Sequence, residues 1–413
     1  MFKPKSSDIL FVDPYSGIYI NLPNMSLAYA ATIYNAPVID QHILPYPKDR
    51  FIRFKSKTLV ISVRSFAYRE AIRIAQRYAK KYSQAEIKSL DALDVQCCYP
   101  FLNFSEKFTI NIDFSDSLPF PRYELFDSFN YLSTNWQIGL WHYPLLTSIG
   151  CPYQCSFCAA RNRTYKMRSI DNCIEELRIA KEKYKIRSFE IIDDVFNLYK
   201  ERVIEFCEKV AALKLSWLCS NGLRADRFDE EEAEALISAG CHTVGFGVES
   251  IFNDILEKIH KGEKIEQIEE AIKIAKKYFS EVKGYFIVGL PSSNYDKDLA
   301  SILWAKKMGI KAVVSYYIPN IDKISFTKDN PEGIFFGSSA LPRSEVYSAY
   351  KQREVYLFAK KYNRQLYNRQ KLPLRLIYLT LKGFKRYNLN SLYTILMIGP
   401  KRFLRILFKG EIQ

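Results

Sequence analysis

Cys151-Pro-Tyr-Gln-Cys155-Ser-Phe-Cys158 is the most distinctive segment of the sequence. Three thiols follow one another at spacings of four and three residues, and Phe157 precedes the third. Thiolates at this density are soft ligands that suit zinc or an iron–sulfur cluster. A tetrahedral zinc site needs four ligands, commonly as two separated pairs, and the sequence has no second CxxC pair. A cubane on three cysteines would leave one iron open to a cosubstrate; a zinc knuckle or a chance cluster is the alternative.

Composition indicates a cytoplasmic globular protein. The 413 residues leave room for two or three domains, and 48% hydrophobic with 25% charged residues is ordinary for a soluble chain. No apolar run reaches about 18 residues, so we expect no transmembrane helix, and the segment after Met1 does not resemble a signal peptide. The nine cysteines are an odd number, which favours a reducing compartment over a disulfide framework.

Positive charge is concentrated at the C-terminus. Residues 340–413 carry 16 Lys/Arg and 3 Asp/Glu, a net charge of +13 out of +15 for the whole chain. The same segment mixes basic residues with aromatic and apolar blocks. Such segments favour anionic membrane surfaces, so a location peripheral to the membrane is one expectation. Packing on the preceding domain with solvated charges is the other main alternative, and nucleic acid is a weaker one.

Residues 1–95 alternate short apolar runs with helix-like stretches. We expect strands near 9–13, 38–44, 58–63 and 85–90, and helices near 25–34 and 67–82. This alternation predicts a small parallel, Rossmann-like α/β domain. Residues 96–140 contain Pro100, Pro119 and Pro121, and we interpret them as a linker that packs against both neighbours.

From Trp141 onward the pattern becomes a repeating β/α unit. Strands are expected at 144–148, 188–192, 216–220, 243–248, 282–288 and 312–318, with helices at 170–184, 200–213, 230–239, 265–279 and 296–308. Six units predict a partial (β/α)6 barrel of the triosephosphate isomerase type over residues 141–325. In such barrels the chemistry collects at the carboxyl ends of the strands. Residues 326–413 are expected to form a basic helical C-terminal region.

The thiol loop and the strand ends together resemble the radical S-adenosylmethionine (SAM) superfamily. The matching segments are CxxxCxxC, Asp193-Asp194-Val-Phe196, Ser220-Asn-Gly-Leu-Arg224, Gly245-Phe-Gly247-Val-Glu249-Ser250, Lys258-Ile-His-Lys-Gly262 and Gly289-Leu-Pro291. Ser292-Ser-Asn departs from the family's GET after the fifth strand. Taken singly, Asp193 and Asp194 would also suit helix caps, but the order of the motifs at successive strand ends favours the family.

The resemblance implies a set of site residues. Cys151, Cys155 and Cys158 would hold a [4Fe–4S] cluster. SAM would lie against the other residues that match the family's motifs, which are Asp193, Asp194, Asn221, Arg224, Glu249 and Gly289.

The N-terminal domain resembles the cobalamin-binding, Rossmann-like domain that precedes the barrel in one subfamily. It differs from that domain in showing four short strands and no late glycine-rich segment. Asp40-Gln-His42 is similar to the family's DxHxxG motif, but Pro45 stands where the glycine should be. We therefore expect a shortened domain that binds cobalamin weakly or not at all.

The resemblance also implies the chemistry. Reductive cleavage of SAM at the cluster would give a 5′-deoxyadenosyl radical for modification of a small-molecule, lipid-linked or peptide substrate. An electron donor such as a flavodoxin or ferredoxin would be a partner. Two alternatives stay open: a cobalamin-dependent radical SAM methyltransferase, and a non-catalytic iron–sulfur scaffold.

Overall fold

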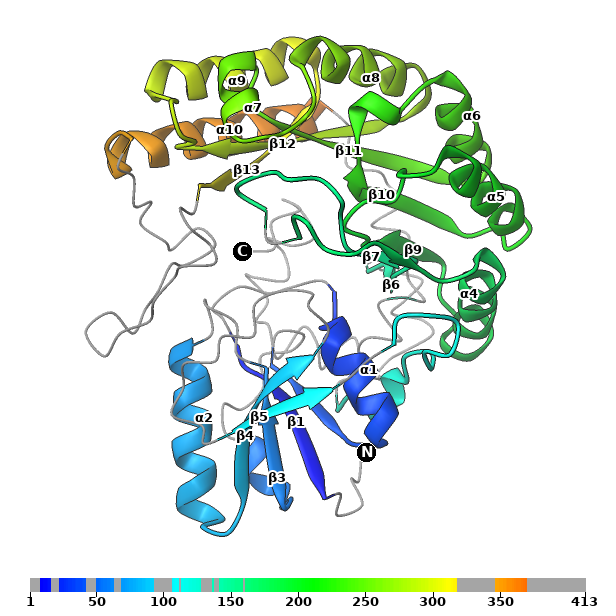
Figure 1. The fold of residues 1–413 in the computed structure, drawn as a ribbon, viewed down its shortest axis with the longest axis vertical. Helices are drawn as coiled ribbons and strands as arrows, with labels where there is room; N and C mark the ends of the chain where they lie inside the picture. The colour runs from blue at the N-terminus through cyan, green and yellow to red at the C-terminus, as the bar shows by residue number, and fades with distance from the viewer. Residues whose placement is uncertain are drawn as a thin grey trace.

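The structure is a computed structural model. It describes residues 8–15, 22–41, 50–62, 68–92, 106–110, 113–127, 136, 141–158, 160–317 and 346–369. Two parallel sheets dominate it, a smaller one near the N-terminus and a larger, curved one that carries most of the helices (Figure 1).

The N-terminal sheet has five parallel strands in the order β2-β1-β3-β4-β5. Its elements are β1 (Ile9–Asp13), α1 (Met25–Tyr34), β2 (Val38–Asp40), β3 (Thr58–Ile61), α2 (Tyr68–Lys81), β4 (Glu86–Ala92) and β5 (Glu106–Ile110). The short strands are almost fully buried at β1, β2 and β3, as expected when helices cover a parallel sheet. The Rossmann-like prediction is confirmed.

The expectation of only four strands is wrong. β5 pairs with β4 from Lys88↔Glu106 to Ala92↔Ile110, so the sheet extends beyond the domain boundary expected at residue 95. β5 is an edge strand that begins with Glu106 and Lys107, and charged residues are common on edges because they discourage pairing with another chain. The strand therefore lacks the apolar run by which the other four were recognised.

The larger sheet has six parallel strands in the order β13-β12-β11-β10-β9-β6. The strands are β6 (Tyr143–Leu145), β9 (Ser188–Ile191), β10 (Ser216–Leu223), β11 (Cys241–Glu249), β12 (Glu281–Val288) and β13 (Lys311–Tyr316). The helices between them are α4 (Ile170–Tyr184), α5 (Lys200–Ala211), α6 (Glu230–Ser238), α7 (Asn253–Lys258), α8 (Ile265–Tyr278) and α9 (Tyr295–Met308). They cover the convex side of the sheet (Figure 1), which confirms the partial barrel.

An aromatic cluster joins the two sheets. The Tyr123 ring lies 4.9 Å from that of Trp136 and 5.6 Å from that of Tyr143 at the start of β6. The Tyr123 hydroxyl also donates to Met25 Sδ of α1 at 3.1 Å, and its backbone N–H bonds the hydroxyl of Tyr184 in α4 at 3.2 Å. Tyr123, from the segment expected to be a linker, thus contacts both the N-terminal sheet's first helix and the barrel.

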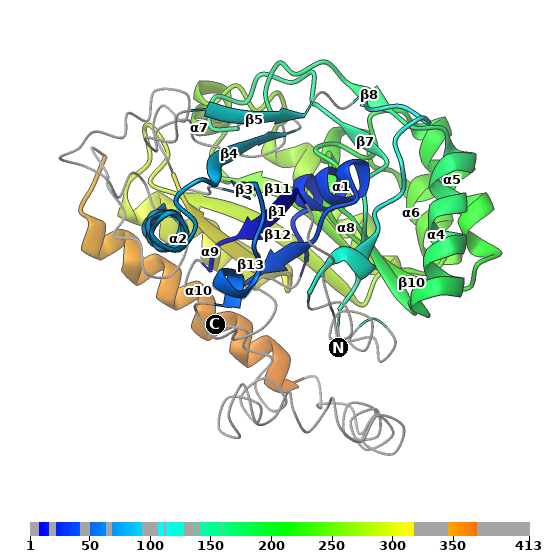
Figure 2. The same cartoon turned by 90° about the horizontal axis from the view of Figure 1, so that it is seen from below.

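The helix α10 (Ala349–Arg369) lies along β13 at the open edge of the barrel (Figure 2). Val355, Ala359 and Tyr362 form its buried side. None of the helices in the described ranges is both long and apolar enough to span a bilayer. The remaining basic stretch, 370–413, lies outside the described residues, as does His42.

Glu232, in the first turn of α6, is a fully buried acid. Neither of its carboxyl oxygens has a hydrogen-bond partner among the described residues. Burial raises the pKa of Glu232 from 4.5 to about 8. The unfolded chain therefore releases this proton above about pH 4.5, whereas the folded chain keeps it up to about pH 8. The free energy of unfolding should fall across that window and level off above it.

The variant Glu232→Gln should gain stability over the wild type as the pH rises from about 5 to 8. The gain should reach roughly 3–5 kcal/mol, because each pKa unit corresponds to about 1.4 kcal/mol. Denaturant midpoints measured across this pH range test it. Glu208→Gln, an exposed change on α5, is the control and should show no such trend. Parallel pH profiles for wild type and Glu232→Gln would contradict the account.

Candidate functional site

The three thiols lie on a loop enclosed by a small antiparallel pair, β7 (Ser148–Ile149) and β8 (Lys166–Met167). Gly150 enters the loop at φ +85°, and a Cβ there would meet the backbone oxygen of Thr164 at 2.2 Å, so only glycine fits. Backbone hydrogen bonds fold the loop on itself, from Cys158 N–H to Cys155 O at 3.0 Å and from Arg163 N–H to Cys151 O at 3.1 Å.

Burial makes the ionised form of the three thiols costly, although Lys261 and Arg224 partly offset this cost. Cys155 is buried and Cys151 and Cys158 are half-buried. Burial raises the pKa of all three, that of Cys155 to about 11, so a positively charged metal group is needed to keep them as thiolates. No group of three His, Cys, Asp or Glu within the described ranges could hold a metal ion. Three closely spaced cysteine thiols are the ligand type that holds an iron–sulfur cluster, so the donor set fits such a cluster.

Asp193 and Asp194 follow β9, and each carboxylate accepts hydrogen bonds from a different part of the segment that leads into the thiol loop. Asp193 is buried and accepts hydrogen bonds from Thr147 N–H at 2.7 Å, Thr147 Oγ1 at 2.5 Å and Ser148 Oγ at 2.7 Å. Burial raises its pKa to about 6. Asp194 instead accepts from the backbone N–H of Gly150 at 2.9 Å. Both carboxylates therefore fasten the thiol loop to β9.

Arg224, at the end of β10, is buried against the thiol loop. Its guanidinium lies 3.5 Å from the centre of the Tyr153 ring, a residue between the first two cysteines. It also pairs with both carboxylate oxygens of Asp226 at 2.8 and 3.0 Å and donates to Lys261 O at 3.3 Å. These contacts occupy the guanidinium within the protein and make Arg224 a positioning residue for the loop.

Glu249 ends β11 at φ +60° and faces a buried lysine. Lys261 Nζ lies 3.3 Å from Glu249 Oε1 and 3.2 Å from Glu263 Oε2. Burial opposes the lysine's charge, but the two carboxylates outweigh it and raise the pKa of Lys261. A Cβ at Gly247 would meet both Glu249 Oε1 and Lys261 Nζ at 2.6 Å, so this glycine makes room for the pair.

The thiol loop docks on the segment that carries Lys261. Ser156 N–H donates to Ile259 O at 2.9 Å, and Cys155 Sγ lies 3.9 Å from Lys261 O. Lys261, Glu263 and Tyr153 thus contact the thiol loop or the residues that support it, and the sequence assigned none of them a role of its own. The Lys-Gly dipeptide of the motif 258–262 was the available signal, but only the fold brings it under the cysteines.

Asn221 and Gly289 complete the residues expected from the sequence. Asn221 lies in β10, and its side chain is outside the described part of the structure. Gly289, at φ +82°, donates its N–H to Asp298 Oδ2 at 2.8 Å. A Cβ at Gly289 would meet the amide of Gln352 from α10 at 2.9 Å, so this strand end is covered by the C-terminal helix, which the sequence did not reveal.

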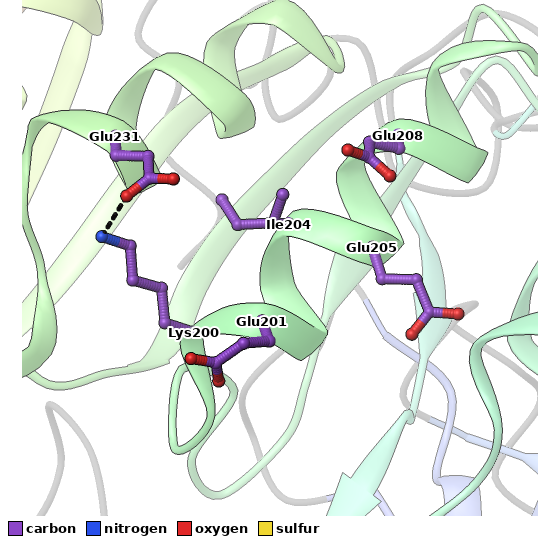
Figure 3. A pocket seen from close by; sticks show the side chains of 6 residues that line it. All are labelled: Lys200, Glu201, Ile204, Glu205, Glu208 and Glu231. Carbon is purple, nitrogen blue, oxygen red and sulfur yellow. Dashed lines mark ion pairs between the residues drawn. The ribbon is translucent and has the colours of Figure 1, made fainter.

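A separate hollow of about 410 Å³ lies on the outside of the barrel between α5 and the start of α6 (Figure 3). Four glutamates and Ile204 line it, together with Lys200, which pairs with Glu231 at 2.5 Å. None of the residues expected from the sequence lies in it, and acidic side chains on a surface do not make a site by themselves.

Comparisons with known proteins agree with this geometry. Residues 145–305 match the radical SAM superfamily model. The chain is 36% identical over 200 residues to an uncharacterized methyltransferase of Pyrococcus horikoshii, an alignment that covers 47% of this chain and 42% of the relative.

Two solved structures share the fold. The radical SAM methyltransferase TsrM of Kitasatospora setae, with tryptophan and a SAM analog bound, matches with a TM-score of 0.60 at 14% identity, covering 75% of this chain and 72% of that one. The cobalamin-dependent SAM radical enzyme OxsB, with aqua-cobalamin and SAM bound, matches with a TM-score of 0.53 at 15% identity, covering 86% and 56%. With the cysteine loop at the barrel strand ends and the superfamily match over the same residues, residues 145–305 form a domain of the radical SAM superfamily.

Proposed function

We propose that this chain is a radical SAM enzyme whose [4Fe–4S] cluster is held by Cys151, Cys155 and Cys158. The observation that carries the proposal is the docking of the thiol loop on the buried Lys261 ion pair at the strand ends. When bound and reduced, such a cluster supplies the electron that splits SAM into methionine and a 5′-deoxyadenosyl radical. A flavodoxin or ferredoxin would serve as the electron donor.

The chain's own residues would orient the reactants and exclude water. Asp194 and Arg224 hold the first part of the thiol loop through Gly150 and Tyr153. Glu249 offers a buried carboxylate whose Oε1 is bonded to Lys261, and we assign it to a hydroxyl or amino group of SAM. Gly289 and Asn221, at two further strand ends, are assigned to SAM on the family motif alone.

Cys155→Ala should abolish the iron–sulfur absorbance of the anaerobically reconstituted protein, because a cubane cannot be retained with only two of its three cysteine ligands. Cys207→Ala is the matched control. Cys207 is buried in α5, among apolar side chains of the barrel core, so its loss should leave the cluster intact. Iron content and the visible spectrum measure both variants. A full cluster in Cys155→Ala would refute the assignment.

Corrinoid-dependent methyl transfer is the second candidate, and the five-stranded N-terminal sheet favours it. The order β2-β1-β3-β4-β5 places a switch point between β1 and β3, and open α/β sheets bind ligands outside the carboxyl ends of the strands at such a point. The carboxyl ends of β4 and β5 point toward the barrel (Figure 1). The relative from Pyrococcus horikoshii is named a methyltransferase, and the OxsB structure contains aqua-cobalamin.

Protein expressed with a corrinoid supply should therefore retain the corrinoid through washing, in about one equivalent by its visible spectrum. Asp13 and Asp40, buried and adjacent in register at the ends of β1 and β2, mark the edge where it would sit. If the washed protein contains no corrinoid, the N-terminal domain binds cobalamin weakly or not at all, as the sequence led us to expect. The substrate modification would then proceed without methyl transfer from a corrinoid.

We further propose that α10 contacts an anionic membrane surface. Its exposed stripe carries Arg353, Lys361 and Arg364, together with Tyr350 at 79% and Leu357 at 52% exposure. A basic face with exposed apolar side chains is typical of interfacial helices.

Binding to anionic vesicles should weaken roughly tenfold or more in the double variant Arg353→Gln, Lys361→Gln, because each basic residue near such a surface contributes about 1 kcal/mol. Lys273→Gln, on the exposed side of α8, is the control and should bind like wild type. Cosedimentation at two salt concentrations measures the effect. Equal binding to neutral vesicles, or binding to neither, would leave packing on the barrel as the role of α10.

A further inference from the structure

The inner face of the barrel sheet is polar where barrels usually carry bulky apolar side chains. Along β12 buried and half-buried residues alternate. The buried set packs outward, as Phe286 does against Trp304 of α9 at 6.4 Å between ring centres. The half-buried set, which includes Glu281, Lys283 and Tyr285, therefore faces the concave side.

Four inner-face residues from three strands form one cluster, which we call the lysine cluster: Glu190, Ser220, Lys283 and Tyr285. Lys283 Nζ donates to Ser220 Oγ at 2.9 Å. The Tyr285 ring lies across β11, where a Cβ at Gly245 would meet it at 2.8 Å. Gly245 is one of the motif glycines, and a Cβ there would also meet the backbone oxygen of Ser220 at 2.5 Å, so two close neighbours explain its place.

The ammonium group of Lys283 is poorly neutralised. Its hydrogen-bond acceptor is the neutral hydroxyl of Ser220, and the nearest carboxylate, Glu281 Oε1, lies 3.7 Å away. Lys311 Nζ lies 3.6 Å from the same Glu281 oxygen, so two lysines share this one carboxylate. Burial lowers the pKa of Lys283 and raises that of Glu190, which agrees with a cation that lacks a close counter-charge. An ammonium has three donors, so beside Ser220 and the long pair with Glu281 at least one remains for a ligand.

Glu281 and Glu190 are the acidic groups that act on Lys283, and the two nearby histidines add no positive charge to the cluster. His142 precedes β6, and its Nδ1 lies 2.8 Å from Ser188 Oγ. His242 begins β11, and its Nδ1 lies 2.8 Å from Thr243 Oγ1. Burial lowers the pKa of both imidazoles, that of His142 to about 4, so they are neutral at pH 7.

We propose that the lysine cluster binds an anionic group of the substrate, a carboxylate or a phosphate, on Lys283. The inference rests on the proposed radical SAM function, because it places the substrate on the concave face below the SAM site. In the register of β11 and β12, Lys283 stands opposite Gly245 and Phe286 stands opposite Glu249. The three residues from Lys283 to Phe286 span roughly 10 Å of strand. A small molecule anchored on Lys283 would thus reach the level of Glu249 with its other end.

Reductive methylation followed by peptide mass spectrometry tests the anchor on the purified full chain. Inorganic phosphate or succinate should slow the labelling of Lys283 roughly tenfold once the anion is about tenfold above its Kd, by mass action. Sodium chloride at equal ionic strength should not. Lys273, exposed on α8, is the internal control and should be labelled equally throughout. Protection by phosphate alone or by succinate alone would identify which anion the substrate carries.

The variant Glu190→Gln provides a second test, because it retains Lys283 and the labelling rate of this lysine can again be measured. Removing this carboxyl should strengthen protection by the anion, because a competing acidic group beside the ammonium is lost. Equal labelling of Lys283 with phosphate, succinate and chloride, in wild type and in Glu190→Gln alike, would overturn the anion site. The labelling needs neither cluster nor SAM. A wild-type protein that takes up no cluster would therefore overturn the proposed function on separate grounds.

Discussion

The buried ion pair of Lys261 with Glu249 and Glu263 is the interaction on which the site depends. Lys261 Nζ lies within 3.3 Å of a carboxylate oxygen of each glutamate, and Glu263 in turn accepts from the backbone N–H of Ala225 at 2.7 Å. The backbone oxygen of Lys261 accepts a hydrogen bond from the guanidinium of Arg224 and is in contact with the thiol of Cys155. One lysine thus ties the thiol loop to the ends of β10 and β11. Breaking a buried pair by removing one partner typically costs about 3–5 kcal/mol, so a change at Lys261 should destabilise the whole arrangement.

The buried Lys261 ion pair supports the thiol loop, where the proposed cleavage of SAM would take place. The thiol loop has little secondary structure of its own, and its geometry comes from contacts with Asp194, Arg224 and the Lys261 segment. The concave face continues from this support toward the lysine cluster, with glycines at 245 and 247 in place of side chains on β11. One face of the N-terminal sheet shares a hydrophobic core with the barrel, and its other face packs in a separate core with α2. The support, the proposed SAM site and the proposed substrate anchor all lie on the barrel sheet.

The sequence predicted the regular elements well and the contacts poorly. Strong apolar periodicity located the six barrel strands to within a few residues, because parallel strands buried on their outer face leave a clear pattern. β5 was missed since an edge strand with Glu106 and Lys107 has no such pattern. Family motifs located Asp193 and Arg224, but their partners Thr147 and Tyr153 depend on the fold. The role of Gln352 in covering Gly289 joins residues 63 positions apart, which no local pattern records.

The most direct test of the central claim is mass spectrometry of the reaction products after anaerobic reconstitution with iron and sulfide, SAM and a strong reductant. The account predicts 5′-deoxyadenosine that accumulates only when the reductant is present. S-adenosylhomocysteine formed beside it would indicate methyl transfer, and its absence would indicate radical chemistry without it. A protein that carries a complete cluster and binds SAM yet yields neither product would contradict the account and leave a non-catalytic iron–sulfur scaffold.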